Sequence, residues 1–253
     1  MSLSSFERPA RPELPRLSVL VPYRDRAVHL QQFIPHMREF LSKDSRIGPA
    51  VIHVIEQHGE APFNRGKLLN CGFDLIGNKA DYLVFHDVDY LPEVADYSFV
   101  DRPTRLIWHG LVLKEDYDNF FGAVCGVPAA AFRAVNGFSN KFWHWGCEDI
   151  DLRLRFQSAG FGIDYRDGVF RSLSHAHNGF DSTGQLRAEV LPNFQRLQDR
   201  WATQGNRPPV SDGLDSLAYR VVSSQELLSQ KDSEICVYLH SVDIGQPDST
   251  KGL

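Results

Sequence analysis

The chain has 253 residues, 42% of them hydrophobic, which is enough for a folded domain with a sizeable core and excludes intrinsic disorder as its main character. Its 27 Lys and Arg residues against 32 Asp and Glu residues leave a formal charge of −5, which excludes a broad positive surface for nucleic acid or an anionic membrane. An anionic ligand therefore needs a local group of Arg and Lys residues, with or without a metal ion.

The N-terminal residues and the cysteines indicate the compartment. Residues 1–16 form a polar, Pro-rich lead without a signal-peptide core, and no apolar run approaches the roughly 20 residues of a membrane span. The cysteines are far apart and form no C-x-x-C pair, so we expect reduced thiols. We expect a cytoplasmic protein with no integral membrane segment and no nucleic-acid partner. The cysteines are Cys71, Cys125, Cys147 and Cys236.

Short apolar runs alternate with helical patterns in the first part of the chain. This order is typical of a parallel α/β sheet, whose ligands bind beyond the carboxyl ends of the strands. Pro35 falls inside the first helical pattern and should kink that helix. The predicted elements are strand Leu17–Val21, helix Ala27–Leu41, strand Val51–Ile55, helix Arg65–Ile76 and strand Tyr82–Phe85.

The later part of the chain continues this α/β pattern. The stretch Cys147–Phe156 alternates as a strand would, but acid-to-base pairs four residues apart favour the helix that we predict. The other predicted elements are strands Arg105–Trp108, Gly122–Val127, Ala218–Val222 and Ile235–Ile244, the short helix Pro128–Val135 and an amphipathic patch Val190–Trp201.

The polar segment 178–210 is unusually long for a connection, and long connections beside candidate ligands are often functional lids. We therefore predict a single domain over residues 17–245, with 178–210 as its lid, and a C-terminal tail over 246–253.

Two motifs could together hold a divalent metal ion. Asp87-Val88-Asp89 follows the third predicted strand, where a carboxylate can bind a cation that binds a diphosphate, although a D-x-D alone can equally be an Asx-turn. His175 and His177 lie on one side of an extended segment, although an H-x-H alone is often two surface histidines. With Asp89, two diphosphate oxygens and a water they would complete an octahedron suited to Mn²⁺, whereas Mg²⁺ favours an all-oxygen shell.

The segment 143–151 combines two Trp residues with three acids. The indoles of Trp143 and Trp145 could stack on a pyranose, and the carboxylates of Glu148 and Asp149 could bind sugar hydroxyls or take a proton from one. The alternative is that the indoles belong to the core and the acids complement a helix N-terminus.

Local cations and a group of aromatic residues could serve the same ligand. The cations suit a nucleotide diphosphate, although a solvated helix N-terminus would look similar. The aromatic residues precede Gly122 and could line a sugar pocket or belong to the core. The cations are Arg24, Arg26, Arg65 and Lys67, and the aromatic residues are Tyr117, Phe120 and Phe121.

Read together, six segments in fixed order resemble the β-1,4-galactosyltransferase family, glycosyltransferase family seven. They extend over nearly the whole chain, so the match is specific. The His-x-His motif is similar to that of the branch that adds galactose to xylose in proteoglycan linkers. The six segments are Val21–Arg26, Phe63–Phe73, Asp87–Asp89, Asn136–Asn140, Phe142–Asp149 and Ser211–Leu214.

The resemblance implies a GT-A-like fold with a mostly parallel sheet and a mobile lid, and an inverting, Mn²⁺-dependent transfer of a hexose, galactose above all, from a UDP-sugar to a saccharide hydroxyl in β-1,4 linkage. Asp149 would be the catalytic base, with Glu148 beside it. The implied donor-binding residues are Pro22, Arg24, Arg26, Phe63, Arg65, Asp87, Val88, Phe120, Gly122 and Trp145. The implied acceptor-binding residues are Tyr117, Trp145, Glu148 and Asp149, and the metal ligands are Asp89, His175 and His177.

Two positions depart from the family pattern. Phe120 stands where many members have Tyr beside the donor sugar. This leaves open whether the transferred sugar is galactose or N-acetylgalactosamine. His144 replaces the usual Gly of the W-G-W-G motif, so we expect a stiffer covering loop around Trp145. The anchor helix and stem of the animal enzymes have no counterpart here, which predicts a bacterial-type enzyme. Two alternative functions are a UDP-sugar hydrolase and a non-catalytic nucleotide- or carbohydrate-binding module.

Overall fold

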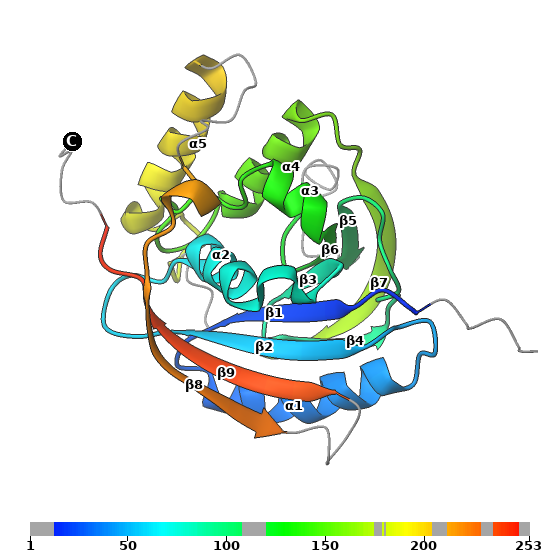
Figure 1. The fold of residues 1–253 in the computed structure, drawn as a ribbon. Helices are drawn as coiled ribbons and strands as arrows, with labels where there is room; N and C mark the ends of the chain where they lie inside the picture. The colour runs from blue at the N-terminus through cyan, green and yellow to red at the C-terminus, as the bar shows by residue number, and fades with distance from the viewer. Residues whose placement is uncertain are drawn as a thin grey trace, which may run out of the picture.

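The computed structural model describes residues 13–107, 120–174, 179, 181–203, 212–228 and 235–247. Within them, nine strands form one sheet in the order β4-β7-β5-β6-β3-β1-β2-β9-β8, flanked by helices (Figure 1). The strands are β1 Leu17–Tyr23, β2 Ala50–Gln57, β3 Tyr82–His86, β4 Tyr90–Val94, β5 Thr104–Ile107, β6 Val124–Pro128, β7 Asp164–Ser172, β8 Arg220–Leu228 and β9 Cys236–Asp243. The α-helices are α1 Ala27–Ser42, α2 Arg65–Ile76, α3 Ala129–Ala134, α4 Glu148–Ser158 and α5 Leu191–Thr203, and short 3₁₀ turns cover Gly77–Lys79, Ala188–Val190 and Leu214–Ser216.

The central strands β3, β1, β2 and β9 are parallel, as the sequence predicts. In the register, Leu17 of β1 pairs with Ala50 of β2 on one side and with Tyr82 of β3 on the other. Parallel strands bring their carboxyl ends to one edge of the sheet. The residues after β1, β2 and β3 therefore meet at that edge, which is where the candidate chemistry lies.

Outside this centre the sheet is mixed, so the expectation of a mostly parallel sheet holds for its middle alone. The pairs β3–β6, β5–β6, β4–β7 and β8–β9 are antiparallel, whereas β5–β7 is parallel. A run of apolar residues predicts a buried strand but carries no information on its direction. The antiparallel direction of β6 against β3 could therefore not be predicted from the apolar runs.

Two strands, β4 and β7, are absent from the sequence prediction. Pro92 lies inside β4 and argues against a central strand, but β4 is at the edge of the sheet and its register shifts between Pro92 and Val94. Strand β7 is rich in charged residues and contains Gly168, which normally weakens a strand. A Cβ at Gly168 would lie 2.6 Å from the carbonyl oxygen of Val94, so glycine permits the close approach.

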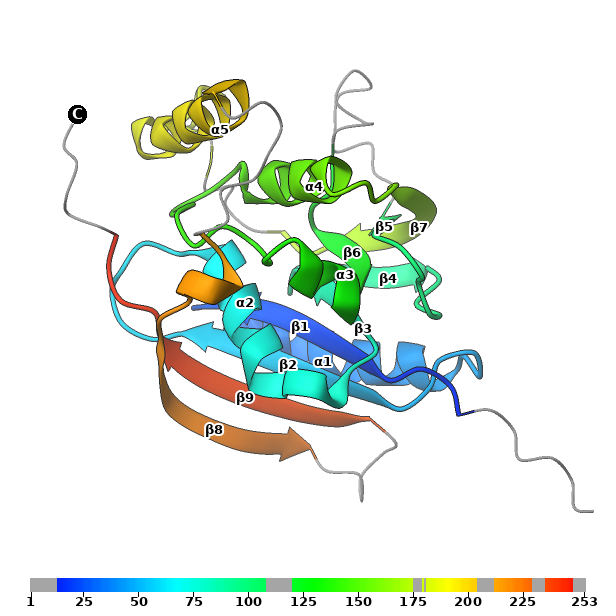
Figure 2. The ribbon, with the colours of Figure 1, turned by 45° about the horizontal axis from the view of Figure 1, so that its top comes forward.

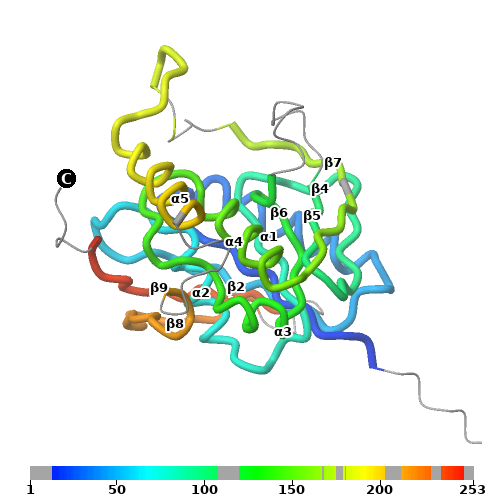
Figure 3. Tube along the Cα trace, turned by 90° about the horizontal axis from the view of Figure 1, so that it is seen from above, coloured from blue at the N-terminus to red at the C-terminus, as the bar shows by residue number. Residues whose placement is uncertain are grey.

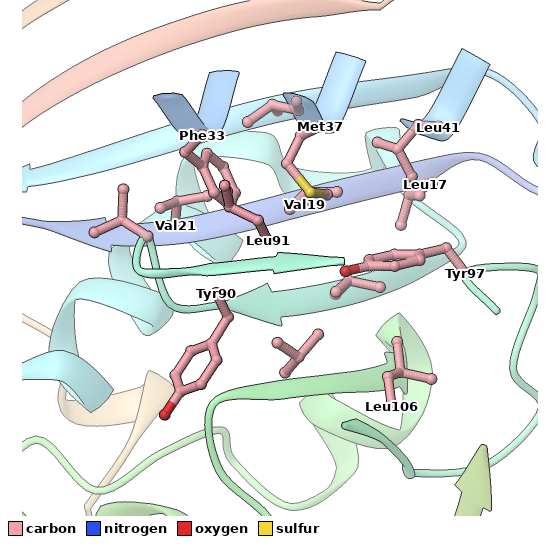
Figure 4. Packing of buried hydrophobic residues seen from close by; sticks show 14 of the residues in the cluster. Leu17, Val19, Val21, Phe33, Met37, Leu41, Tyr90, Leu91, Tyr97 and Leu106 are labelled. Atoms are coloured by element: carbon pink, nitrogen blue, oxygen red, sulfur yellow. The ribbon is translucent and has the colours of Figure 1, made fainter. Parts of the chain in front are cut away.

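Helix α1 covers one face of the parallel strands. Phe33, Met37 and Leu41 project from it onto residues of β1 such as Val19 and Val21, and each of these five is at most 2% exposed (Figure 4). Burial of each such side chain contributes about 1.5–3 kcal/mol.

The proline inside α1 is accommodated without ending the helix. Pro35 is exposed, so the carbonyl that its missing N–H leaves unpaired can be solvated. The predicted helix is confirmed over its whole length.

Helices α2, α3 and α4 pack on the opposite face, against residues of β1 and β3 that include Leu20, Leu83 and Phe85 (Figure 2). The predicted helix Arg65–Ile76 matches α2, and the predicted helix around Glu148 matches α4. Both helices begin at the edge where the parallel strands end, which places their first turns beside Asp87. All four cysteines are buried and free, as predicted. Among the described helices, none has the length and apolar character needed to cross a bilayer.

Candidate active site

An arginine joins two carboxylates from different elements at the carboxyl edge of the parallel strands. Arg65 is the first residue of α2, Asp87 directly follows β3, and Glu148 is the first residue of α4. Arg65 Nε donates to Asp87 Oδ1 over 2.7 Å, and Arg65 Nη1 lies 3.6 Å from Glu148 Oε1. Their side chains are only 12%, 27% and 13% exposed, so the charges face one another with little solvent between them.

The carboxylates of this edge resist ionisation. Burial raises the pKa of Asp87 and of Asp149, while Arg65 acts in the opposite direction on both. Burial and the neighbouring Asp149 raise the pKa of Glu148 to about 7. We call Asp87, Glu148 and Asp149 the carboxylate cluster. Its members repel one another, so added positive charge would stabilise it.

The raised pKa of Glu148 makes the stability of the metal-free protein depend on pH. The folded protein keeps the Glu148 proton up to about pH 7, whereas the unfolded chain loses it near the ordinary pKa of 4.5. Stability therefore falls as pH rises through this window, on the order of 3 kcal/mol from this group at most. We expect denaturant unfolding in EDTA at pH 4.5 and pH 7 to show a smaller fall for Glu148→Gln than for the natural chain.

The matched control for this measurement is Glu226→Gln, which makes the same change at an exposed position of β8. It should keep the pH dependence of the natural chain. An equal fall in stability for Glu148→Gln and the natural chain would show that Glu148 is not the group that titrates in this window.

Asp149 lies against the chain that leads into β6. A Cβ at Gly122 would overlap Asp149 Oδ2, and it would lie 3.0 Å from the ring of Phe120. A larger residue at position 122 would therefore displace the Asp149 carboxylate from its position, and Phe120 borders the same space. The predicted donor residues Phe120 and Gly122 thus lie beside the predicted base.

A second group of predicted residues lies after β1. The guanidinium of Arg24 stacks over the ring of Phe63 at 5.5 Å, and its Nη1 donates to the Ala61 carbonyl over 2.5 Å. A cavity of about 330 Å³ opens beside this pair, with polar lining. Its lining residues are Arg24, Asp25, Glu56, Gln57, His58, Gly59 and Glu60.

The loop 143–147, which we call the tryptophan loop, connects these two groups. The backbone N–H of His144 donates to the Phe63 carbonyl over 2.7 Å, and the loop leads directly into Glu148. His144, Gly146 and Cys147 have φ values of +67°, +93° and +76°. A non-glycine residue in this conformation costs on the order of 1–3 kcal/mol. His144 therefore stands at a position where glycine would be relaxed, which accounts for the glycine of the family motif.

The two indoles of the loop have different surroundings. Trp143 packs with buried residues such as Ile55 and Leu68, so the core interpretation holds for it. Trp145 is 41% exposed and precedes Glu148 of the carboxylate cluster by three residues. The structure thus separates two residues that the sequence could not tell apart.

The structure also gives the surroundings of the other predicted residues. Lys67 donates to the Ile244 carbonyl over 2.7 Å and lies 5.9 Å from the Trp143 ring, so its ammonium group binds the chain that follows β9. Phe121 is 1% exposed and belongs to the core. Pro22 and Val88 are buried beneath the edge, and Arg26 lies directly before α1.

Of the three predicted metal ligands, Asp89 lies within the described residues, where it is 7% exposed. Its backbone carbonyl accepts a 2.7 Å hydrogen bond from the N–H of Leu173, at the end of β7. His175, His177 and Tyr117 lie outside the described residues. Within the described ranges, no three His, Cys, Asp or Glu side chains form a group that could hold a metal ion.

Sequence reasoning missed several residues that shape this edge. Gln57 is 2% exposed at the end of β2, and its side chain bonds Ala61, Pro62 and the N–H of Asn64. The sequence signal that could have identified Gln57 is a polar residue at the end of an apolar strand, the same signal that identified Asp87. Asn193 of α5, described below, left no comparable signal because it lies in a polar segment.

A buried ion network forms the other part of the site that the sequence did not show. Asp151 pairs with Arg155 over 2.9 Å and with Arg200 over 3.0 Å, and both arginines also lie by Asp212. All four residues are at most 8% exposed. Asp151, unlike Glu148 and Asp149, therefore has a structural role, which is to pair with the two buried arginines.

Comparison with known proteins gives consistent similarities. Residues 8–100 match the N-terminal region of glycosyl transferase group 7, and residues 107–178 match a model described as the N-terminal domain of galactosyltransferase. Beta-1,4-galactosyltransferase 7 of Drosophila melanogaster is 30% identical over 84% of this chain, and beta-1,4-galactosyltransferase 5 of Mus musculus is 35% identical over 81%. The chain spans 65% and 51% of the length of these two relatives.

Solved structures resemble the fold. The catalytic domain of Drosophila beta-1,4-galactosyltransferase 7 in complex with xylobiose has a TM-score of 0.72 and 26% identity over 92% of this chain and 95% of that one. A mutant of that protein with manganese, UDP-Gal and xylobiose has a TM-score of 0.73 and 27% identity over the same shares. GalNAc-T7 with UDP, GalNAc and Mn²⁺ shares the fold at a TM-score of 0.51, with 11% identity over 75% of this chain and 49% of that one. The arrangement is therefore the GT-A fold.

Proposed function

The chain belongs to glycosyl transferase group 7, and from that premise we propose that it transfers galactose from UDP-galactose to a saccharide hydroxyl, with inversion at the anomeric carbon. The observation that carries this proposal is the position of Arg65 between Asp87 and Glu148. Arg65 Nη2 is buried and has no hydrogen-bond partner among the described residues. A buried guanidinium N–H without a partner is costly, and a phosphate or sugar oxygen of the donor would satisfy it.

The donor would extend from Arg65 toward the Arg24–Phe63 pair. A planar base can stack on an aromatic ring, and the 330 Å³ cavity beside Arg24 offers space for the nucleoside. Arg24 and Arg26 would contribute positive charge there. Trp145 would cover the galactose from the tryptophan loop.

Asp89 fits a divalent metal ion, because a buried carboxylate is a hard oxygen ligand. We propose that His175 and His177, which follow Leu173 closely in the sequence, supply two imidazole ligands. Leu173 is hydrogen-bonded to Asp89, which supports this assignment. When bound, Mn²⁺ would neutralise negative charge that grows on the departing diphosphate.

Asp149 would remove the proton of the acceptor hydroxyl while that oxygen attacks the anomeric carbon from the face opposite the diphosphate. Burial raises the pKa of Asp149 and so makes it a better proton acceptor than a surface aspartate. Glu148 and Trp145 would position the acceptor. The segment 178–210 would border the acceptor site, and its helix α5, which Arg200 fixes to Asp151 of α4, would keep its place when the donor binds.

The Drosophila relative whose structure contains xylobiose supports a xyloside as the first acceptor to test. Phe120 borders the donor sugar space in place of a tyrosine, so galactose and N-acetylgalactosamine donors should be compared directly. We also propose a cytoplasmic location, which the four free cysteines support because reduced thiols are typical of that compartment.

Purified protein should release UDP from UDP-galactose when Mn²⁺ and an acceptor are both present. Acceptors to compare are xylosides and N-acetylglucosaminides, with UDP-N-acetylgalactosamine as the competing donor. Equal release with and without an acceptor would favour a UDP-sugar hydrolase. Saturable UDP binding without turnover of any donor would favour a binding module.

A further inference from the structure

Helix α5 contacts the tryptophan loop through one buried amide. Asn193, in the first turn of α5, is 3% exposed. Its Nδ2 donates to the Trp143 carbonyl over 2.7 Å and to the Trp145 carbonyl over 3.1 Å. The two acceptors flank His144, so a single side chain holds the backbone on both sides of that residue.

Helix α5 is itself fixed to the first turn of α4. Arg200 donates to both carboxylate oxygens of Asp151 over 3.1 and 3.0 Å, and Trp201 Nε1 donates to Asp151 Oδ1 over 3.1 Å. Arg200 also contacts Asp212 and donates to Ser139. Asp151 is two residues after Asp149, so α5 and the start of α4 are held together (Figures 2 and 3).

The tryptophan loop needs such support because its backbone is held in an unusual conformation. His144 and Cys147 have positive φ, which disfavours them relative to glycine. On one side the loop is held by the hydrogen bond from His144 to Phe63, and Gly179 packs directly on the Trp145 indole. On the other side Asn193 supplies two hydrogen bonds to its carbonyls.

We propose that Asn193 is a positioning residue that fixes the tryptophan loop, and with it the Trp145 indole, in the orientation that covers the donor sugar. This inference rests on the proposed function. Asn193 acts through the backbone of Trp143 and Trp145 and contacts no reacting atom. Because UDP lacks the sugar, Asn193 affects the use of UDP-galactose more than the binding of UDP.

The test replaces the amide with groups that lack its two N–H donors. Asn193→Asp keeps the shape but turns a carboxylate oxygen toward the two carbonyls, and Asn193→Ser gives a neutral second variant. The control is Gln198→Glu, the same amide-to-carboxylate change on the exposed side of α5. Measurements are kcat and KM with UDP-galactose and Mn²⁺, the Kd of UDP by calorimetry, the Tm, and acrylamide quenching of the Trp145 emission. The Trp145 emission is the difference between the fluorescence of each protein and that of the same protein carrying Trp145→Phe.

We expect kcat/KM for UDP-galactose to fall on the order of 10–100-fold in both Asn193 variants, because a displacement of about 1 Å at a positioning group can cost 10²-fold. Trp145 quenching should rise, while the Kd of UDP and the values for Gln198→Glu stay unchanged.

Unchanged kcat/KM and quenching in folded Asn193 variants would overturn the inference. So would a loss of UDP affinity in proportion to a lowered Tm, because that result indicates a general structural role. If the natural chain transfers no galactose, the proposed function fails, whereas the quenching measurement still decides whether Asn193 fixes the loop.

Discussion

Replacing Asp149 with asparagine should lower kcat on the order of 10²–10⁴-fold, the range that a general base contributes, with little change in the affinity for UDP. The asparagine amide has the shape of the carboxylate but cannot accept the proton of the acceptor hydroxyl. Asp149 is suited to this task by its burial, which raises its pKa, and by its position against Gly122, where the predicted donor residue Phe120 borders the same space. Initial rates with UDP-galactose and a xyloside give kcat, and calorimetry gives the Kd of UDP.

The control for this change is Asp215→Asn, on the exposed 3₁₀ turn Leu214–Ser216. It should keep the activity of the natural chain. Full turnover by Asp149→Asn would remove Asp149 as the base and direct attention to Glu148, whose pKa of about 7 also permits proton transfer near neutral pH.

Asp89→Ala should abolish the Mn²⁺-dependent part of UDP binding. The expected loss of metal affinity exceeds about 100-fold, because loss of a group that only supports a metal ligand already costs about 10–100-fold. The measurement is calorimetric titration of UDP in Mn²⁺ and in EDTA. In the natural chain the two titrations should differ strongly, and in Asp89→Ala they should coincide.

Two further proteins make this test specific. Asp101→Ala removes an exposed carboxylate and should retain the Mn²⁺ dependence of the natural chain. His177→Ala tests the predicted imidazole ligand and should behave like Asp89→Ala. Unchanged titrations for either Asp89→Ala or His177→Ala would show that the ligand set is wrong.

Much of the fold and of the candidate site could be predicted because both follow from local patterns. The alternation of apolar runs with helical patterns predicted the parallel strands β1, β2 and β3, helical spacing predicted α1 and α2, and the strand ends pointed to Arg24 and Asp87. Arg65 was predicted at the start of a helix, and Glu148 was singled out in the Trp- and acid-rich segment; the structure places both at that edge, each as the first residue of a helix.

The remainder depends on tertiary contacts that leave no local pattern. Lys67 and Arg65 are two residues apart in one helix, yet Lys67 reaches Ile244 and Arg65 reaches Asp87. Trp143 and Trp145 are equally close, yet Trp143 is partly buried against the core and Trp145 is 41% exposed. Strand β8 is exposed along nearly its whole length. Its sequence therefore lacks the alternation of buried apolar and exposed polar residues by which a strand is predicted.

The network of Asp151, Arg155, Arg200 and Asp212 restricts how this chain can vary. Loss of one member leaves a partner charge uncompensated away from water, at about 3–5 kcal/mol, which is a large share of the 5–15 kcal/mol stability of an ordinary domain. Concerted exchange of the set for apolar residues of similar volume escapes that penalty. Substitutions at these four positions should consequently depend on one another, so that the two acids and two arginines are kept together or replaced together. Substitutions in α4, which carries the candidate base Asp149, should therefore depend on substitutions in α5, which supports the tryptophan loop.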